Sequence, residues 1–203
     1  MDTKSSSTRN WPLLLATGMI VAALLAVAYV LLSATSKPEA RGQFTQFAKG
    51  GIARLEELPA PPPQTARAFT DAAGTETNLA AFRGEVVVVN VWATSCAPCM
   101  EEMPTLGALQ RQFAGRGLRV VPISIDKVSD YDQAKRELAR LTQNTLPFYT
   151  DASRGVLFDS HAAGLPVTIL YDRQGRERAR LTGGADWASP EAAALMEALL
   201  GEG

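Results

Sequence analysis

Hydrophobic and polar positions divide the chain into an apolar run, a polar stretch and a long region of alternating patterns. Residues 13–32 are predominantly apolar and carry no charged side chain. About 20 such residues suffice to span a bilayer. Lys4 and Arg9 precede the run, so the positive-inside rule places the N-terminus in the cytoplasm and everything after Ser33 outside. We therefore expect a cytoplasmic segment at 1–12 and a transmembrane signal anchor at 13–32.

A cleaved signal peptide is the alternative interpretation of this run. The apolar region of a signal peptide is normally about 7 to 15 residues long and ends at a small-residue cleavage site. The run at 13–32 is longer, and Ser33-Ala34-Thr35 resembles such a site only weakly. The length favours an uncleaved anchor.

Residues 33–65 are small, polar and rich in proline, which predicts a periplasmic linker. Phe44, Phe47, Leu55 and Leu58 lie at roughly helical spacing, so one short helix inside the linker is possible. The sequence Pro-Ala-Pro-Pro-Pro that begins at Pro59 is typical of a stiff polyproline II spacer. We place the boundary of a globular domain, residues 66–203, directly after it.

Apolar positions within 66–203 switch between strand-like and helix-like patterns. The β-branched run at 86–91 predicts a strand buried on both faces, and a second buried strand is expected at 119–125. A helix that starts at the intervening Cys99 connects them, so the two strands should pair in parallel through a right-handed crossover. The other expected elements are a hairpin at 68–77, short helices at 78–82 and 152–158, a helix over 131–141, an extended piece at 147–150, a second hairpin at 167–181 and a final helix that opens at Ser189-Pro190. This order predicts an α/β domain.

Composition and charge narrow the classes of function. The 203 residues are 46% hydrophobic and 20% charged, which leaves room for one globular domain with an extension. The formal net charge is −1, without the basic face that a nucleic-acid-binding protein presents. We therefore expect no nucleic-acid partner.

Both cysteines of the chain, Cys96 and Cys99, lie in one turn between the predicted strand at 86–91 and the following helix. A thiol at the start of a helix is close to unpaired backbone N–H groups and the positive end of the helix dipole, which stabilise the thiolate. Cys96 is then the attacking nucleophile, and Cys99 resolves the mixed disulfide. Pro98 suits the first helical turn because its missing N–H costs little there.

Three other roles are open to a cysteine pair at this spacing. A purely structural disulfide would close a four-residue ring and stabilise the fold little. Zinc normally takes four ligands, and only His161 could add a further Cys or His side chain. Because thiolates suit Cu(I), a copper-carrying chaperone using Cys96 and Cys99, with or without His161, stays open as an alternative. The favoured interpretation requires no metal and no cofactor beyond the dithiol itself.

Four motifs together resemble the TlpA/ResA type of thioredoxin-fold protein. They are Trp92-Ala93-Thr94, Cys96-Ala97-Pro98-Cys99, Glu102-Met103-Pro104 and Gly164-Leu165-Pro166-Val167-Thr168. The resemblance runs from about Phe69 to the C-terminus. It implies a thioredoxin fold, with a mixed central sheet flanked by helices, and a membrane-tethered thiol-disulfide oxidoreductase that acts as a reductant.

The resemblance also assigns roles to residues outside the cysteine pair. Pro166 matches the cis-proline beside the cysteine turn, and Leu165 then offers backbone hydrogen bonds to the substrate. Trp92 and Ser95 complete the expected substrate-binding set. Ser95 departs from the pattern, because relatives usually carry tryptophan there, which puts substrate preference and redox potential in question.

Two acidic residues follow the cysteine turn, and a carboxylate near Cys99 could accept and return its proton. The residues alone do not say whether Glu101 or Glu102 points inward. The resemblance selects Glu102 as the acid beside the resolving cysteine. Asn90 stands where thioredoxin has a buried aspartate, so we expect Glu102 to take over that role.

The partners implied by the resemblance are exported protein disulfides and an electron donor in the membrane. Reduction of a copper chaperone and of the copper-site subunit of cytochrome oxidase is preferred, and apocytochrome c is the alternative client. A membrane thiol reductase of the DsbD/CcdA kind would recharge the protein. We expect a monomer on the inner (cytoplasmic) membrane, with a single span and a periplasmic catalytic domain.

Overall fold

The computed structural model describes residues 19–20, 24, 26–27 and 42–202. The chain divides into two units between Arg41 and Gly42. The predicted cytoplasmic segment and most of the predicted anchor lie outside the described residues, and the five described residues of the anchor are helical. Within the described part of the chain, no helix combines the length and the apolar character that crossing a membrane would take.

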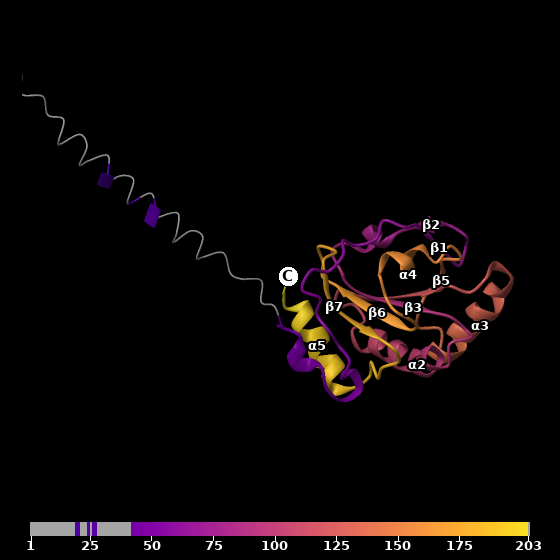
Figure 1. Ribbon diagram of the computed structural model, residues 1–203. Helices are drawn as coiled ribbons and strands as arrows, with labels where there is room; N and C mark the ends of the chain where they lie inside the picture. Colours follow the sequence, from indigo (N-terminus) through magenta and orange to yellow (C-terminus); the bar gives the residue numbers. More distant parts are fainter. Residues whose placement is uncertain (1–18, 21–23, 25, 28–41, 203) are drawn as a thin grey trace, which may run out of the picture. The chain divides into compact units, whose positions relative to one another are not determined.

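Residues 42–202 form a seven-stranded mixed sheet in the order β2-β1-β5-β4-β3-β6-β7 (Figure 1). Strands β3, β4 and β5 are parallel, and the neighbouring pairs on both sides are antiparallel. The parallel pairing of β3 with β4 through a helix and the two hairpins were all expected. The strands are β1 Phe69–Asp71, β2 Glu76–Thr77, β3 Val86–Trp92, β4 Leu118–Ser124, β5 Tyr149–Thr150, β6 Val167–Tyr171 and β7 Glu177–Thr182.

The helices begin and end close to the predicted positions. Ser189 caps the final helix by accepting a hydrogen bond from the backbone N–H of Ala192, and Pro190 occupies its first position, as the sequence predicts. The α-helices are α2 Ala97–Gln112, α3 Tyr131–Thr142, α4 Gly155–Asp159 and α5 Pro190–Leu200, and the 3-10 helices are η1 Thr45–Phe47, η2 Gly50–Ile52, η3 Leu79–Phe82 and η4 Val128–Asp130.

Strand β3 lies at the centre of the sheet and supplies side chains to both faces. Val88 and Trp92 point into a cluster completed by α2, α3 and α5, whereas Val87, Val89 and Val91 point into a cluster completed by α4 and η3. Figure 1 shows the three longer helices on one side of the sheet and α4 on the other. Burial of each aliphatic side chain contributes roughly 1.5–3 kcal/mol. The continuous β-branched run is therefore explained by helices on both faces.

The compact unit begins at Gly42, earlier than the boundary at residue 66 that the proline-rich composition suggested. Phe44, Ile52 and Leu55 are buried against the cluster that contains α5. The possible helix takes the form of two 3-10 turns, because Gly50 adopts a left-handed backbone with φ of 54° that interrupts helical geometry. Glu56 then pairs with Arg180 at the outer edge of β7. Residues 42–58 are thus part of the domain.

Candidate redox site

Cys96 caps the N-terminus of α2. Its backbone is extended, and its sulfur accepts a hydrogen bond from the backbone N–H of Cys99 at 3.3 Å. Pro98 lies in the first turn of the helix, as expected. In this structure the two sulfurs are joined in a disulfide with an S–S distance of 2.06 Å. When the bond is reduced, the same N–H group and the helix dipole favour a thiolate on Cys96.

The two sulfur-bearing residues differ in access to solvent. Cys96 is half-buried, whereas Cys99 is 0% exposed and belongs to the core beneath α2. A protein-sized reactant can therefore reach Cys96 first. Cys99 can act only on a bond already formed at Cys96.

A buried carboxylate at the end of β4 fixes the segment that precedes the cysteines. Asp126 accepts hydrogen bonds from the backbone N–H of Thr94 at 3.0 Å and from its hydroxyl at 2.8 Å. Ser124 donates a further hydrogen bond to the same carboxylate at 2.8 Å. The turn is thus held in place from the neighbouring parallel strand.

The strand register brings the proline loop to the cysteine turn. Val167 at the start of β6 pairs with Val91 near the end of β3, so Pro166 lies beside the segment that leads into Cys96. The Leu165-Pro166 peptide bond is cis, as the resemblance predicted. Leu165 is half-buried and packs against both core clusters, as Cys96 does.

Two residues assigned to substrate binding occupy different environments. Ser95 is exposed directly before Cys96, where a docked protein would meet it. Trp92 is 0% exposed and belongs to the core cluster beneath α2. Its expected contact with substrate is not compatible with this burial, because the indole packs inward from the last residue of β3. Trp92 supports the turn from below.

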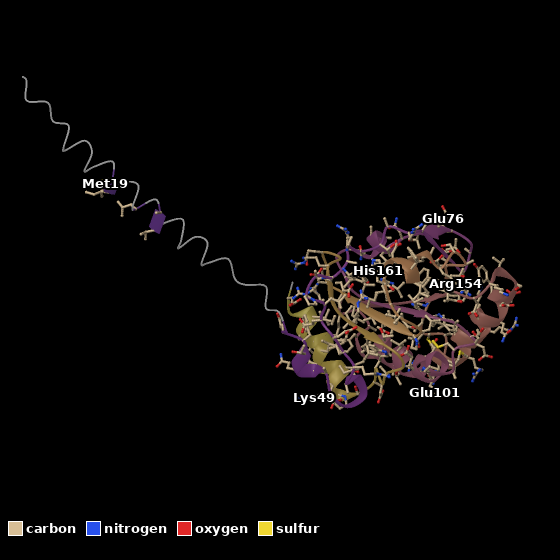
Figure 2. All side chains as sticks on the ribbon, in the orientation of Figure 1. Met19, Lys49, Glu76, Glu101, Arg154 and His161 are labelled. Carbon is tan, nitrogen blue, oxygen red and sulfur yellow. A yellow bond between two sulfur atoms is a disulfide. The ribbon has the colours of Figure 1, made fainter. Side chains whose placement is uncertain are left out.

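Glu102 lies one helical turn after Cys99 and is only 2% exposed. It accepts hydrogen bonds from the Asn90 side-chain amide at 2.7 Å, from the backbone N–H of Ala185 at 3.0 Å and from the Trp187 indole N–H at 3.3 Å. Glu101 is exposed and lies at the surface of the domain (Figure 2). The choice of Glu102 over Glu101 as the inward-facing acid is therefore confirmed.

Burial raises the pKa of Glu102 from 4.5 to about 7. The hydrogen bonds from Asn90, Ala185 and Trp187 oppose this rise, and the positive charge of Arg54 opposes it further. Loss of hydration outweighs these effects because the three bonded donors carry no charge. A carboxyl with such a pKa exchanges its proton near neutral pH.

The described residues contain no group of three His, Cys, Asp or Glu side chains that could hold a metal ion. His161 is exposed and follows α4 (Figure 2). A three-ligand copper site formed by Cys96, Cys99 and His161 is thus not present in this conformation.

The sequence pattern of the AhpC/TSA family matches residues 59–180, which is more than half of the chain. The match contains the cysteine turn, Glu102 and the cis-proline. The chain belongs to the AhpC/TSA family. Within this AhpC/TSA protein, the predicted resemblance to the TlpA/ResA type is confirmed by the relatives described next.

Two relatives are 30% identical to the chain. One is the thiol-disulfide oxidoreductase ResA of Geobacillus kaustophilus, aligned over 57% of this chain and 64% of its own length. The other is the thioredoxin-like protein YneN of Bacillus subtilis, aligned over 50% and 59%. The chain therefore spans about three fifths of the length of these curated relatives.

The fold is shared with solved structures. The thioredoxin domain of a thiol-disulfide oxidoreductase from Bacteroides vulgatus matches with a TM-score of 0.58 at 22% identity, over 70% of this chain and 99% of that one. At this level of identity the match establishes the thioredoxin-like fold alone. The expected mixed sheet with flanking helices is confirmed.

Three contributors to the site in this AhpC/TSA protein were not assigned by sequence reasoning. Asp126 could have been found, because the carboxyl ends of neighbouring parallel strands meet at one edge of a sheet and Asp126 follows β4 there. Trp187 is 85 residues from Glu102 along the chain, and no local pattern indicates that its indole N–H donates to that carboxyl. Arg54 is 130 residues from its partner Gly184 along the chain, and no local pattern links them.

Proposed function

We propose that this protein is a thiol-disulfide oxidoreductase that reduces disulfides in exported proteins. The single observation that carries the proposal is the difference between the two sulfurs: Cys96 is accessible at a helix N-terminus, and Cys99 is buried behind it. The names of the ResA relatives add support for exchange chemistry. The redox group is the protein's own cysteine pair.

The proposed reaction begins with the reduced protein. The Cys96 thiolate attacks one sulfur of a client disulfide, forms a mixed disulfide and expels the second client sulfur as a thiolate. The Cys99 thiolate then attacks the Cys96 sulfur and releases the first client sulfur. Two electrons pass to the client, and the Cys96–Cys99 disulfide present in this structure is the product.

Glu102 serves as the proton acceptor for Cys99 in this scheme. The two residues are three positions apart on α2 and therefore lie on the same side of the helix. Because the pKa of Glu102 is about 7, the carboxyl can take the Cys99 proton during resolution and return it when the disulfide is reopened. Leu165 and Ser95 flank Cys96 and are the proposed contacts for the client backbone.

The proposed location is the outer face of the inner membrane, with residues 13–32 as the anchor. Support comes from the uncharged apolar run and from its described residues, which are helical and include four large apolar side chains that are 55–75% exposed: Met19, Ile20, Leu24 and Val27. A membrane thiol reductase of the DsbD/CcdA kind would supply electrons. Carbonate extraction of membranes tests the anchor: retention of the full-length chain in the pellet is expected, and release as a shortened soluble form would refute it.

The proposed clients are cysteine pairs in the assembly of the cytochrome oxidase copper centre, with apocytochrome c as the alternative. The motif resemblance supports this client class, because reductants of the TlpA/ResA type act on exported metal-site thiols. Client capture in the native host decides between the two classes.

The decisive experiment uses two matched cysteine variants of the full-length chain. Cys99→Ser should accumulate mixed disulfides through Cys96, which appear as higher-mass species on non-reducing gels and disappear with dithiothreitol. Cys96→Ser should trap nothing, because its remaining thiol is buried. If both variants still reduced a protein disulfide at the parental rate, the mechanism would be wrong.

A further inference from the structure

The peptide group between Gly184 and Ala185 connects the N-terminal segment to the buried carboxyl of the redox site. Its N–H belongs to Ala185 and donates to Oε2 of Glu102 at 3.0 Å. Its carbonyl belongs to Gly184 and accepts a short hydrogen bond from Nη2 of Arg54. A single planar peptide unit thus lies between a guanidinium and a carboxyl.

The space around this peptide is filled on both sides. A Cβ atom on Gly183, whose φ is 90°, would lie 3.0 Å from the Arg54 guanidinium. A Cβ atom on Gly184 would lie 3.1 Å from the carbonyl oxygen of Pro98, inside the cysteine turn. The two glycines therefore let the loop fit between Arg54 and the first turn of α2.

The same loop is fastened at two further points. The backbone N–H of Gly183 donates to the carbonyl of Pro166 at 2.7 Å, and the backbone N–H of Trp187 donates to the Thr105 hydroxyl at 3.0 Å. The position of the peptide relative to Glu102 is thus fixed from the cis-proline loop, from α2 and from Arg54.

We propose that Arg54 is a positioning residue for Glu102 and acts through the Gly184–Ala185 peptide group. The guanidinium orients the peptide so that its N–H faces the carboxylate, and a cation on the carbonyl oxygen strengthens that N–H as a donor, since linked hydrogen bonds polarise one another. The ionised form of Glu102 is favoured in consequence. The inference rests on the proposed role of Glu102 as the proton acceptor for Cys99.

The acidic side chains nearest to Glu102 in the sequence of its surrounding segments point to solvent. Asp186 is exposed, and its carboxylate caps the backbone N–H of Ala188. Glu101 is exposed on the neighbouring position of α2. The two thiols do not titrate in the disulfide form. Arg54 is the charged side chain among the described residues whose electrostatic effect lowers the pKa of Glu102.

The test follows the Trp187 indole N–H of the oxidised full-length protein by 15N NMR from pH 5 to 9. This N–H donates to Glu102, so its resonance should titrate with a midpoint of about 7. Trp187→Phe assigns the signal, and Glu102→Gln should abolish the transition. Arg54→Gln should raise the midpoint by about half a pH unit, a small shift because Arg54 is exposed and its charge is screened by solvent.

The matched controls are Arg54→Lys and Arg140→Gln. Lysine keeps the charge, so Arg54→Lys should restore part of the shift. Arg140 is 66% exposed and pairs with Glu137 on α3, so its replacement should leave the midpoint unchanged. If Arg54→Gln lowered only the melting temperature and left the midpoint in place, the inference would be refuted.

Failure of the proposed function and failure of the role of Arg54 would give different experimental results. The NMR titration uses the oxidised protein and requires no client. Loss of client trapping by Cys99→Ser would overturn the oxidoreductase proposal while the indole midpoint still responded to Arg54. An unmoved midpoint with intact trapping would overturn the role of Arg54 alone.

Discussion

Two buried carboxylates on opposite faces of the sheet differ in the charge of the groups that contact them. Glu177 and Arg180 form a bidentate ion pair, with nitrogen–oxygen distances of 2.5 and 2.7 Å and side chains that are 2% and 5% exposed. Glu102 is equally buried, but within the described residues the hydrogen bonds that it accepts come from neutral groups. One carboxylate has a full countercharge in contact, and the other does not.

A buried carboxylate can thus stabilise the fold or take part in proton exchange, depending on the charge of the groups around it. The ion pair holds elements together: Arg180 also donates to the carbonyl of Ser160 at 2.7 Å, which ties β7 to the end of α4. A carboxylate surrounded by neutral donors is stabilised only in part, so its pKa rises into the range where protons are exchanged. The second arrangement lies one helical turn from Cys99.

Removal of the guanidinium from the Glu177–Arg180 ion pair should destabilise the fold strongly. Arg180→Met leaves Glu177 buried without its countercharge, which should lower the free energy of unfolding by about 3–5 kcal/mol. Urea denaturation at pH 7 measures it, with Arg140→Met as the surface control, expected within about 0.5 kcal/mol of the parent. A combined Glu177→Leu/Arg180→Met variant should recover much of the loss. A cost for Arg180→Met no larger than the control's would contradict the assigned role of this pair.

A smaller effect concerns the pH dependence of stability. Folding raises the pKa of Glu102 from 4.5 to about 7. Between these two pH values the carboxyl is protonated in the folded state and ionised in the unfolded state. Its stabilising contribution is complete below pH 4.5 and is lost as pH rises through 7, a change of about 3 kcal/mol. Denaturation of the oxidised protein at intervals from pH 4.5 to 8, compared with Glu102→Gln, isolates this contribution. Parallel curves for the two proteins would show that Glu102 does not titrate there.

A still smaller effect is expected when Glu102 loses one of its neutral hydrogen-bond donors. Trp187→Phe removes the indole N–H that lowers the pKa of Glu102 and keeps the aromatic ring in the core. The pKa should rise by about half a unit to one unit, the equivalent of one hydrogen bond. Glutamate side-chain 13C NMR reads the titration directly. A fall in the pKa would mean that solvent has entered the site.

The sequence predicted the reactive residues of the site better than the residues that pack around them. The cysteine turn, the cis-proline and the inward choice of Glu102 follow from short motifs whose spacing is local. The burial of Trp92 was missed because the predicted strand ended at residue 91, whereas β3 continues through Trp92 and is buried along its whole length. Arg54 and the packing of residues 42–58 were missed because proline-rich composition suggested a linker, while the contacts that fix the segment come from Arg180 and Gly184, far along the chain.

The two edges of the sheet also bear on the proposed reduction of exported proteins, which would reach this protein partly unfolded. An open strand edge is a template on which another extended chain can add and aggregate. Here one edge ends in β2, which has two residues, and the backbone of Glu56 exchanges two hydrogen bonds of 2.9 Å with Arg180 at the other edge. For the proposed function, these short or covered edges mean that an unfolded client bound at Cys96 would find poor sites for strand addition on the same sheet, which limits co-aggregation.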